Sequence, residues 1–123
     1  MAKLLVVFKD KVQQEVKLAK ETVRIGRDSD NEIQIDNPGV SRFHAEVYRQ
    51  GYPFYVEDMK STNGTFVNGS FVSWKAALND GDRIRIGKHD LIFQLEASDY
   101  REAGTKKVDF GETVCIRPQE KKR

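Results

Sequence analysis

Three short segments of the chain combine glycine with side chains that donate hydrogen bonds. They are residues 26–31 (GRDSDN), 39–44 (GVSRFH) and 60–69 (KSTNGTFVNG), named here the first, second and third donor segments. The planar guanidinium of an arginine suits a phosphate dianion, and hydroxyl and amide groups fill its remaining acceptor sites. Glycine lets the backbone come close to a ligand. If the fold brings the three segments together, they predict a binding site for a phosphate group.

The rest of the sequence must position these segments, and it has the pattern of short β-strands. Polar and apolar residues alternate over residues 22–26, as expected for a half-buried strand, and turn residues separate most of the apolar runs. The expected strands are residues 4–8, 12–18, 22–26, 33–35, 44–49, 53–57, 83–86 and 91–95. Many short strands with close turns predict an all-β sandwich, whose loops gather at its two ends.

Composition narrows the class of protein. The chain has 123 residues, which suits one domain, and its formal net charge of +2 comes from mixed positive and negative residues. A mixed surface argues against a nucleic-acid partner. The longest apolar run near the start, residues 4–8, is too short for a signal peptide or a membrane span. Cys115 is the single cysteine. We therefore expect a cytoplasmic protein with no cofactor, metal or membrane partner.

The character of the sequence changes near residue 98. The following stretch is polar and contains no strand-like alternation, and residues 114–116 (VCI) form one apolar island before a charged end. Such a composition is typical of a linker or a mobile terminus. We expect one binding domain over residues 1–97 and a flexible tail or linker over residues 98–123.

The donor segments and their spacing resemble the signature of the forkhead-associated (FHA) family. The matching elements stand in order as Gly26-Arg27, Ser41-x-x-His44, STNGT at residues 61–65, and Asn68-Gly69. The resemblance covers residues 4–96. It implies a sandwich of two antiparallel sheets with about eleven short strands, and loops at one end that recognise phosphothreonine. It also implies a protein–protein interaction module in Ser/Thr kinase signalling, with a phosphothreonine protein or peptide as partner.

The resemblance also assigns roles to individual residues. Those implied to bind the phosphopeptide are Arg27, Ser41 and Arg42 at the phosphate, Thr62 facing the phosphate, and Asn63 on the peptide main chain. Those implied to shape the loops are Gly26, His44, Gly64 and Asn68. Asn68-Gly69 is also an ordinary hairpin-turn sequence, so Asn68 either braces that loop or touches the peptide. Within the family, selectivity commonly lies three residues after the phosphothreonine, and residues 37–40, 70–79 and 87–90 are the surfaces expected to read it.

Two other functions compete with this interpretation. Ser41 and His44 could serve as nucleophile and base, but the sequence shows neither an orienting acid nor an oxyanion hole, so we expect no enzyme. The other alternative is an interaction domain of a larger protein whose contact ignores phosphorylation. Trp74 lies in a stretch that we expect to be a loop. Packing against the domain accounts for this residue, so we assign it no role in binding.

The tail contains a candidate ligand for the domain itself. Thr113 is followed by an apolar residue at the third position, within residues 112–116 (ETVCI). Counted from Glu96, 113 − 96 gives 17 residues, and a flexible chain of that length spans on average about 23 Å. Phosphorylated Thr113 is therefore a hypothetical ligand for the same chain or for a neighbouring copy. An unmodified apolar island, or the edge of a following domain, is the competing interpretation.

Overall fold

The computed structural model describes residues 2–96, and within them the chain forms eleven β-strands and no helix. The strands are β1 (Lys3–Phe8), β2 (Lys11–Lys17), β3 (Thr22–Gly26), β4 (Ile33–Gln34), β5 (Ala45–Arg49), β6 (Phe54–Asp58), β7 (Thr65–Val67), β8 (Ser70–Phe71), β9 (Lys75–Leu78), β10 (Arg83–Ile86) and β11 (His89–Gln94). A helix able to cross a membrane is absent from this part of the chain. The tail proposed for residues 98–123, with Thr113 and Cys115, lies outside the described residues, so the domain boundary stays a prediction.

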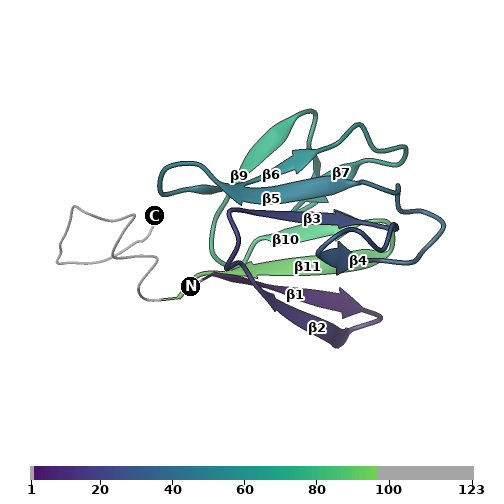
Figure 1. Cartoon of the computed structure of the whole chain (residues 1–123), viewed down its shortest axis with the longest axis horizontal. Helices are drawn as coiled ribbons and strands as arrows, with labels where there is room; N and C mark the ends of the chain where they lie inside the picture. Colours follow the sequence, from purple (N-terminus) through teal and green to yellow (C-terminus); the bar gives the residue numbers. More distant parts are fainter. Residues whose placement is uncertain (1, 97–123) are drawn as a thin grey trace, which may run out of the picture.

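The strands form two sheets that face one another (Figure 1). One sheet has six strands in the order β2-β1-β11-β10-β7-β8, and the other has five in the order β4-β3-β5-β6-β9. All neighbouring pairs are antiparallel except β3 and β4, whose short pairing is parallel. The predicted all-β sandwich of about eleven strands is confirmed. In Figure 1 the strand β1 begins at the left, and the end of β3 and the short β4 lie at the opposite end.

The core lies between the two sheets and is built from alternate residues of the strands. In β10, Ile84 and Ile86 are buried while Arg83 and Arg85, which alternate with them, are exposed, and this is the period-two pattern of a sandwich. Phe54 of β6 and Phe93 of β11 pack across the two sheets, with 5.3 Å between their ring centroids. This contact joins the two sheets. The loops at the ends are therefore attached to a rigid support.

The structure corrects the sequence analysis between residues 65 and 90. Residues 70–79 were expected as loop but contain β8 and β9, and β7 was not expected at all. These strands have two to four residues, which is too short to show alternation, and two alanines in β9 lower its β-propensity. Pairing of β7 with β10 and of β9 with β6 decides their conformation. Within residues 87–90, only Gly87 and Lys88 form the turn, because His89 and Asp90 begin β11.

Candidate functional site

The three donor segments meet at one end of the sandwich, where direct hydrogen bonds join them. The backbone N–H of Arg27 donates to the carbonyl oxygen of Ser41 at 2.9 Å, and that of Asp28 donates to the carbonyl of Arg42 at 3.2 Å. The backbone N–H of Thr62 donates to the hydroxyl oxygen of Ser41 at 3.0 Å. The first and third segments are thus both bonded to the second. The convergence that the sequence analysis required is present.

Gly26 is required because the second segment passes directly over it. A Cβ atom at Gly26 would lie 2.2 Å from the carbonyl oxygen of Arg42 and 2.8 Å from the side-chain nitrogen of Asn31. That nitrogen donates to the carbonyl oxygens of Asp28 and Arg42, both at 2.8 Å. Asn31 is buried, and its amide therefore joins the two backbones within the site. The role predicted for Gly26 has a steric cause, whereas the brace formed by Asn31 was not predicted.

His44 joins the second segment to the third. Its side chain is fully buried, and its Nδ1 accepts a hydrogen bond from the backbone N–H of Ser41 at 3.0 Å. An accepting Nδ1 leaves the ring proton on Nε2, which donates to the carbonyl oxygen of Gly64 at 2.9 Å. Both ring nitrogens are used by backbone groups, so His44 is not placed to take a proton from the Ser41 hydroxyl. The geometry argues against the nucleophile–base alternative and supports a structural role.

Asp58 holds the third segment in place, and the sequence analysis missed it. Its carboxylate accepts the hydroxyl of Ser61 at 2.5 Å, the backbone N–H of Ser61 at 3.1 Å, and the hydroxyl of Thr65 at 2.7 Å. Burial alone would raise the pKa of Asp58, but these hydrogen bonds outweigh it and the pKa lies below its ordinary value. The signal that could have found it is an Asp three residues before a Ser at a strand end, a common local side-chain-to-backbone bond.

The side chains assigned to the ligand are exposed on this support, except that of Ser41, which is half-buried. Arg27 donates from Nε to the carbonyl oxygen of Val40 at 3.0 Å, which fixes its guanidinium and leaves the terminal nitrogens for a ligand. Asn63 donates to the carbonyl oxygen of Gly39 at 2.9 Å, a bond that does not use its own amide oxygen. Thr62 is also exposed. The structure therefore brings together Arg27, Ser41, Arg42, Thr62 and Asn63.

Arg42 differs from Arg27 because it has an acidic partner. Its guanidinium lies 3.3 Å from the carboxylate of Asp28, and its side chain is 68% exposed. The hydrogen bond from the backbone of Asp30, and then the contact with Arg42, hold the pKa of Asp28 below its ordinary value. Asp28 thus stays ionised and shares Arg42 with any anion that binds. Arg27 is the cation with the clearer path to a phosphate.

Gly64 and Asn68 shape the third segment in different ways. Gly64 has a φ of +89°, and a Cβ there would lie 2.9 Å from the ring of Phe71. Asn68 has a φ of +50° in the turn between β7 and β8. Its amide donates to the carboxylate of Asp82 at 2.9 Å and accepts the backbone N–H of Arg83 at 3.0 Å. Asn68 therefore braces a hairpin turn against the start of β10, as one of its two predicted roles requires.

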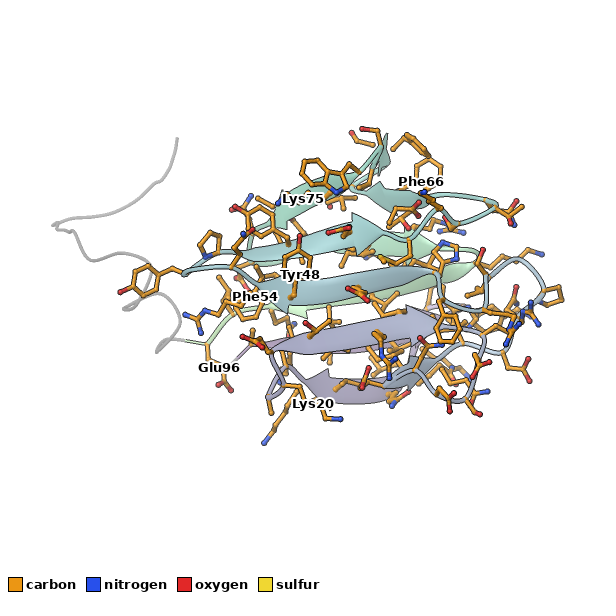
Figure 2. All side chains as sticks on the ribbon, turned by 45° about the horizontal axis from the view of Figure 1, so that its top comes forward. Lys20, Tyr48, Phe54, Phe66, Lys75 and Glu96 are labelled. Atoms are coloured by element: carbon orange, nitrogen blue, oxygen red, sulfur yellow. The ribbon has the colours of Figure 1, made fainter. Side chains whose placement is uncertain are left out.

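The surfaces expected to read the ligand beyond the phosphothreonine lie in two places. A Cβ at Gly39 would be 3.8 Å from the side chain of Asn63 and 3.9 Å from Gly87, so residues 37–40 and 87–88 adjoin the site. A hollow of about 500 Å³ continues beside them, lined by Phe8, Lys9, Asp10, Asn37, Arg85, Lys88 and Asp90. Residues 70–79 divide between the two sheets, because β8 belongs to the six-stranded sheet and β9 to the five-stranded one. Lys75 of β9 (labelled in Figure 2) lies 4.9 Å from the ring of Tyr55.

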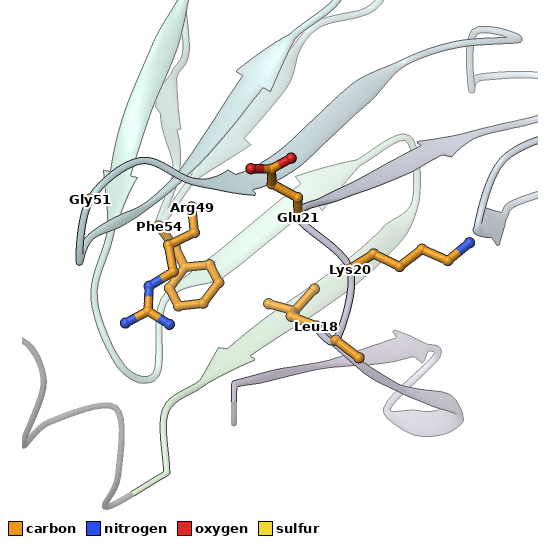
Figure 3. A pocket seen from close by; sticks show the side chains of 7 residues that line it. Leu18, Lys20, Glu21, Arg49, Gly51 and Phe54 are labelled. Carbon is orange, nitrogen blue, oxygen red and sulfur yellow. The ribbon is translucent and has the colours of Figure 1, made fainter.

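A second hollow lies at the opposite end of the sandwich (Figure 3). Its volume is about 350 Å³, and Leu18 and Phe54 contribute apolar surface to it. The guanidinium of Arg49 lies 5.3 Å from the ring centroid of Phe54. None of the predicted ligand residues lines this hollow. Among the described residues there is also no cluster of three His, Cys, Asp or Glu side chains able to hold a metal ion.

Comparison with known proteins agrees with this geometry. The model of the FHA domain family matches residues 23–87, which is more than half of the chain and includes all three donor segments. The chain belongs to the FHA domain family. The match also covers Thr62, Asn63 and the residues of β7–β10 that support them.

Several relatives and solved structures share this domain. The transcriptional regulatory protein EmbR of Mycobacterium tuberculosis is 40% identical over 80 residues, covering 65% of this chain and 21% of EmbR. The glycogen accumulation regulator GarA of Mycolicibacterium smegmatis is 43% identical over 76 residues, covering 62% of this chain and 48% of GarA. EmbR in complex with a low-affinity phosphopeptide superposes with a TM-score of 0.71 and 35% identity, covering 78% of this chain and 24% of that chain. The chain thus spans about half, or less, of these curated relatives.

We predict that Gly26→Ala destabilises the domain and loosens the site, because the new methyl group must displace the carbonyl of Arg42. Overpacking of this kind costs about 1–3 kcal/mol in the free energy of unfolding, measured by urea denaturation. Gly39→Ala is the matched control, since a Cβ there meets nothing closer than 3.4 Å. Equal stability of the two variants would contradict the steric account.

We predict an acid-sensitive contact at Glu32, which joins the end of the first segment to β3. Its carboxylate accepts the backbone N–H of Arg24 at 2.8 Å, which lowers the pKa of Glu32 from 4.5 to about 2. A depressed pKa stabilises the fold above pH 4.5, and this contribution is lost as the pH falls towards 2. Glu32→Gln should lower the free energy of unfolding at neutral pH and flatten its decline over that window. A decline as steep as that of the unmodified chain would exclude this role.

Proposed function

We propose that this chain binds a phosphothreonine segment of a partner protein at the loop end of the sandwich. The observation that carries the proposal is the bonded junction of the three donor segments: the Arg27 guanidinium donates to the carbonyl oxygen of Val40, the residue before Ser41, and the Ser41 hydroxyl oxygen accepts the backbone N–H of Thr62. The Ser41 oxygen already accepts the Thr62 N–H, so its own proton is available to donate to a phosphate oxygen. In the solved relatives, EmbR holds a phosphopeptide, and FHA domains have been solved for their phosphothreonine-dependent interactions.

The hydrogen bonds available at the site can supply the binding free energy of a signalling interaction. A phosphothreonine carries about −1.5 to −2 charges at neutral pH. Hydrogen bonds to charged groups contribute roughly 1.5–3 kcal/mol each, so those from Arg27, Ser41 and Thr62 supply much of the roughly −8 kcal/mol of a micromolar complex. Asn63 adds specificity because it holds the peptide main chain. Burial of the threonine methyl group contributes about 0.8 kcal/mol, and the stiffer β-branched side chain adds to the preference over phosphoserine.

The proposed module acts by recognition, in keeping with the use of both His44 nitrogens by the backbone. Its ligand exists only after a Ser/Thr kinase has acted, which places the module in kinase signalling. We propose a cytoplasmic location because the ligand depends on a kinase, and because a single cysteine suits a reducing compartment. The complete activities of EmbR and GarA are not proposed for this chain, because each of these proteins is longer than the region that matches.

Phosphorylated Thr113 remains a proposed ligand for the same chain or a neighbouring copy, although it lies outside the described residues. The support is its spacing from Glu96 and the apolar residue that follows at the third position. Kinase treatment should then block a fluorescent phosphothreonine peptide from the site, and Thr113→Val should prevent the block. Unchanged peptide binding after full phosphorylation of Thr113 would exclude self-recognition.

We predict that Arg27→Ala abolishes measurable binding of a phosphothreonine peptide while the fold stays intact, because Arg27 is exposed and its side chain makes a single hydrogen bond within the domain, to the carbonyl oxygen of Val40. Isothermal calorimetry with matched phosphorylated and unphosphorylated peptides measures the effect, and circular dichroism checks the fold. Arg49→Ala, at the opposite end of the sandwich, is the matched control and should bind normally. Unchanged affinity of the Arg27 variant, or equal binding of both peptides, would overturn the proposed function.

A further inference from the structure

The outer face of the six-stranded sheet is more apolar than a solvent-facing sheet requires. The strand β1 has a continuous apolar run, in which Leu4 and Val6 are buried in the core. Because side chains alternate along a strand, Leu5 and Val7 lie on the opposite face, where they are half-buried. Strands that are apolar on both faces are typical of sheets covered on both sides. No described segment of the chain forms a third layer over this face.

The strand register shows which side chains are neighbours on this face. Leu5 of β1 pairs with Glu15 of β2 on one side and with Ile92 of β11 on the other, and Ile92 pairs with Arg83 of β10. Residues that pair directly across strands have side chains on the same face. One row across four adjacent strands therefore reads Glu15, Leu5, Ile92, Arg83. We call it the central row.

The central row is complementary to itself. It has an acid at one end, two aliphatic residues in the middle and a base at the other end. A two-fold axis parallel to the strands, passing between Leu5 and Ile92, places Glu15 of one copy opposite Arg83 of the second copy, and Leu5 opposite Ile92. The same operation gives the reciprocal pair, as an isologous interface requires. A partner surface with only positive or only negative charges would not complement both ends of the central row.

We propose that this face is a site of self-association between two copies of the chain. In a single copy, Glu15 is already paired with Lys3 at 3.2 Å and Arg83 with Asp90 at 3.0 Å. Contact between the copies would join these pairs into two networks of alternating charge at the edges of an aliphatic centre. Charged edges around an apolar centre are the usual anatomy of an interface.

The neighbouring row contributes less to this contact. It contains Val12, Val7, Asp90 and Arg85, again in register across the four strands. The same axis places Val7 opposite Asp90 and Val12 opposite Arg85, so valines meet the stems of charged side chains. Arg83 and Arg85 both contact Asp90 within one copy, at 3.0 Å and 3.5 Å, which limits the charge that must be desolvated. The central row therefore determines how the two copies pair.

The overlapping area predicts a weak complex. Four strands about 4.8 Å apart and about 20 Å long give roughly 400 Å² on each copy, or about 800 Å² in total. Interfaces below about 1,200 Å² belong to weak or transient complexes. We expect a dissociation constant between about 10 µM and 1 mM, so that dimers form at high local concentration.

The symmetry has a functional consequence that rests on the proposed function. Rotation about an axis parallel to the strands keeps the direction of each strand end, so the loop ends of both copies face the same way. The bonded junction of the donor segments lies at that end and outside the four strands of the contact. A pair of copies would present two phosphothreonine sites side by side and would favour partners phosphorylated twice.

Charge reversal tests the pairing directly. In the full chain, Glu15→Arg places like charges opposite Arg83 of the second copy, and Arg83→Glu places like charges opposite Glu15. Each variant alone should self-associate at least about tenfold more weakly in sedimentation velocity from 10 µM to 1 mM. An equimolar mixture of the two variants should recover the dimer, because both cross-copy pairs are then opposite in charge. This recovery also shows that both variants are folded.

Glu21→Arg is the control, since Glu21 is exposed in the connection between β2 and β3 and lies outside this face. It should dimerise like the unmodified chain. A monomer throughout the concentration range, or a dimer that both charge reversals leave unchanged, would overturn the proposal. Calorimetry with a singly phosphorylated peptide separates the two proposals, because E15R and R83E should bind it normally. Loss of phosphate dependence in the unmodified chain would refute the proposed function and leave self-association standing.

Discussion

The buried imidazole of His44 accepts the backbone N–H of Ser41 and donates to the backbone carbonyl of Gly64, and the loop end depends on these two bonds. A fully buried ring with two polar atoms is stable only when both are paired, since an unpaired buried polar group costs about 1–3 kcal/mol. The second and third donor segments therefore hold a fixed relation to one another. Gly26 extends the same constraint to the first segment, because the carbonyl of Arg42 lies where a side chain would be.

In this arrangement the buried residues support the loops, and the exposed residues are left for the ligand. His44 and Asp58 use their polar atoms, and Asn31 uses its amide nitrogen, on backbone and loop hydroxyl groups, and these bonds hold the loops in shape. Arg27 and Asn63 each use one hydrogen bond to the second segment and keep their other polar atoms for a ligand. A site that is ordered before the ligand arrives loses less conformational entropy on binding. That is how a small number of exposed donors can give useful affinity.

The charges at the loop end favour selectivity over indiscriminate anion binding. The ionised Asp28 accompanies Arg42, so the second cation of the site is partly neutralised before any ligand binds. A dianionic phosphate can compete for this arginine better than a singly charged carboxylate, because its attraction to the two arginines is larger. The pairing of Arg42 therefore discourages glutamate and aspartate peptides. The same surface remains mixed in charge, which agrees with the small net charge of the chain.

The sequence by itself determined the all-β class, most of the strands and the ligand-binding segments, because alternation and turn residues act over a few positions and the loop signature is linear. It also indicated Gly26, Arg27, Ser41, His44 and Asn63 by their order and spacing. Only the tertiary structure showed why Gly26 cannot carry a side chain, and that Asn31 and Asp58 support the loops, since those contacts depend on backbone positions far apart in the chain. The short strands β7, β8 and β9 were likewise decided by pairing partners, which two to four residues cannot specify. The central row on the outer face was also decided by the tertiary structure, because only the pairing register of the strands brings Glu15, Leu5, Ile92 and Arg83 into line.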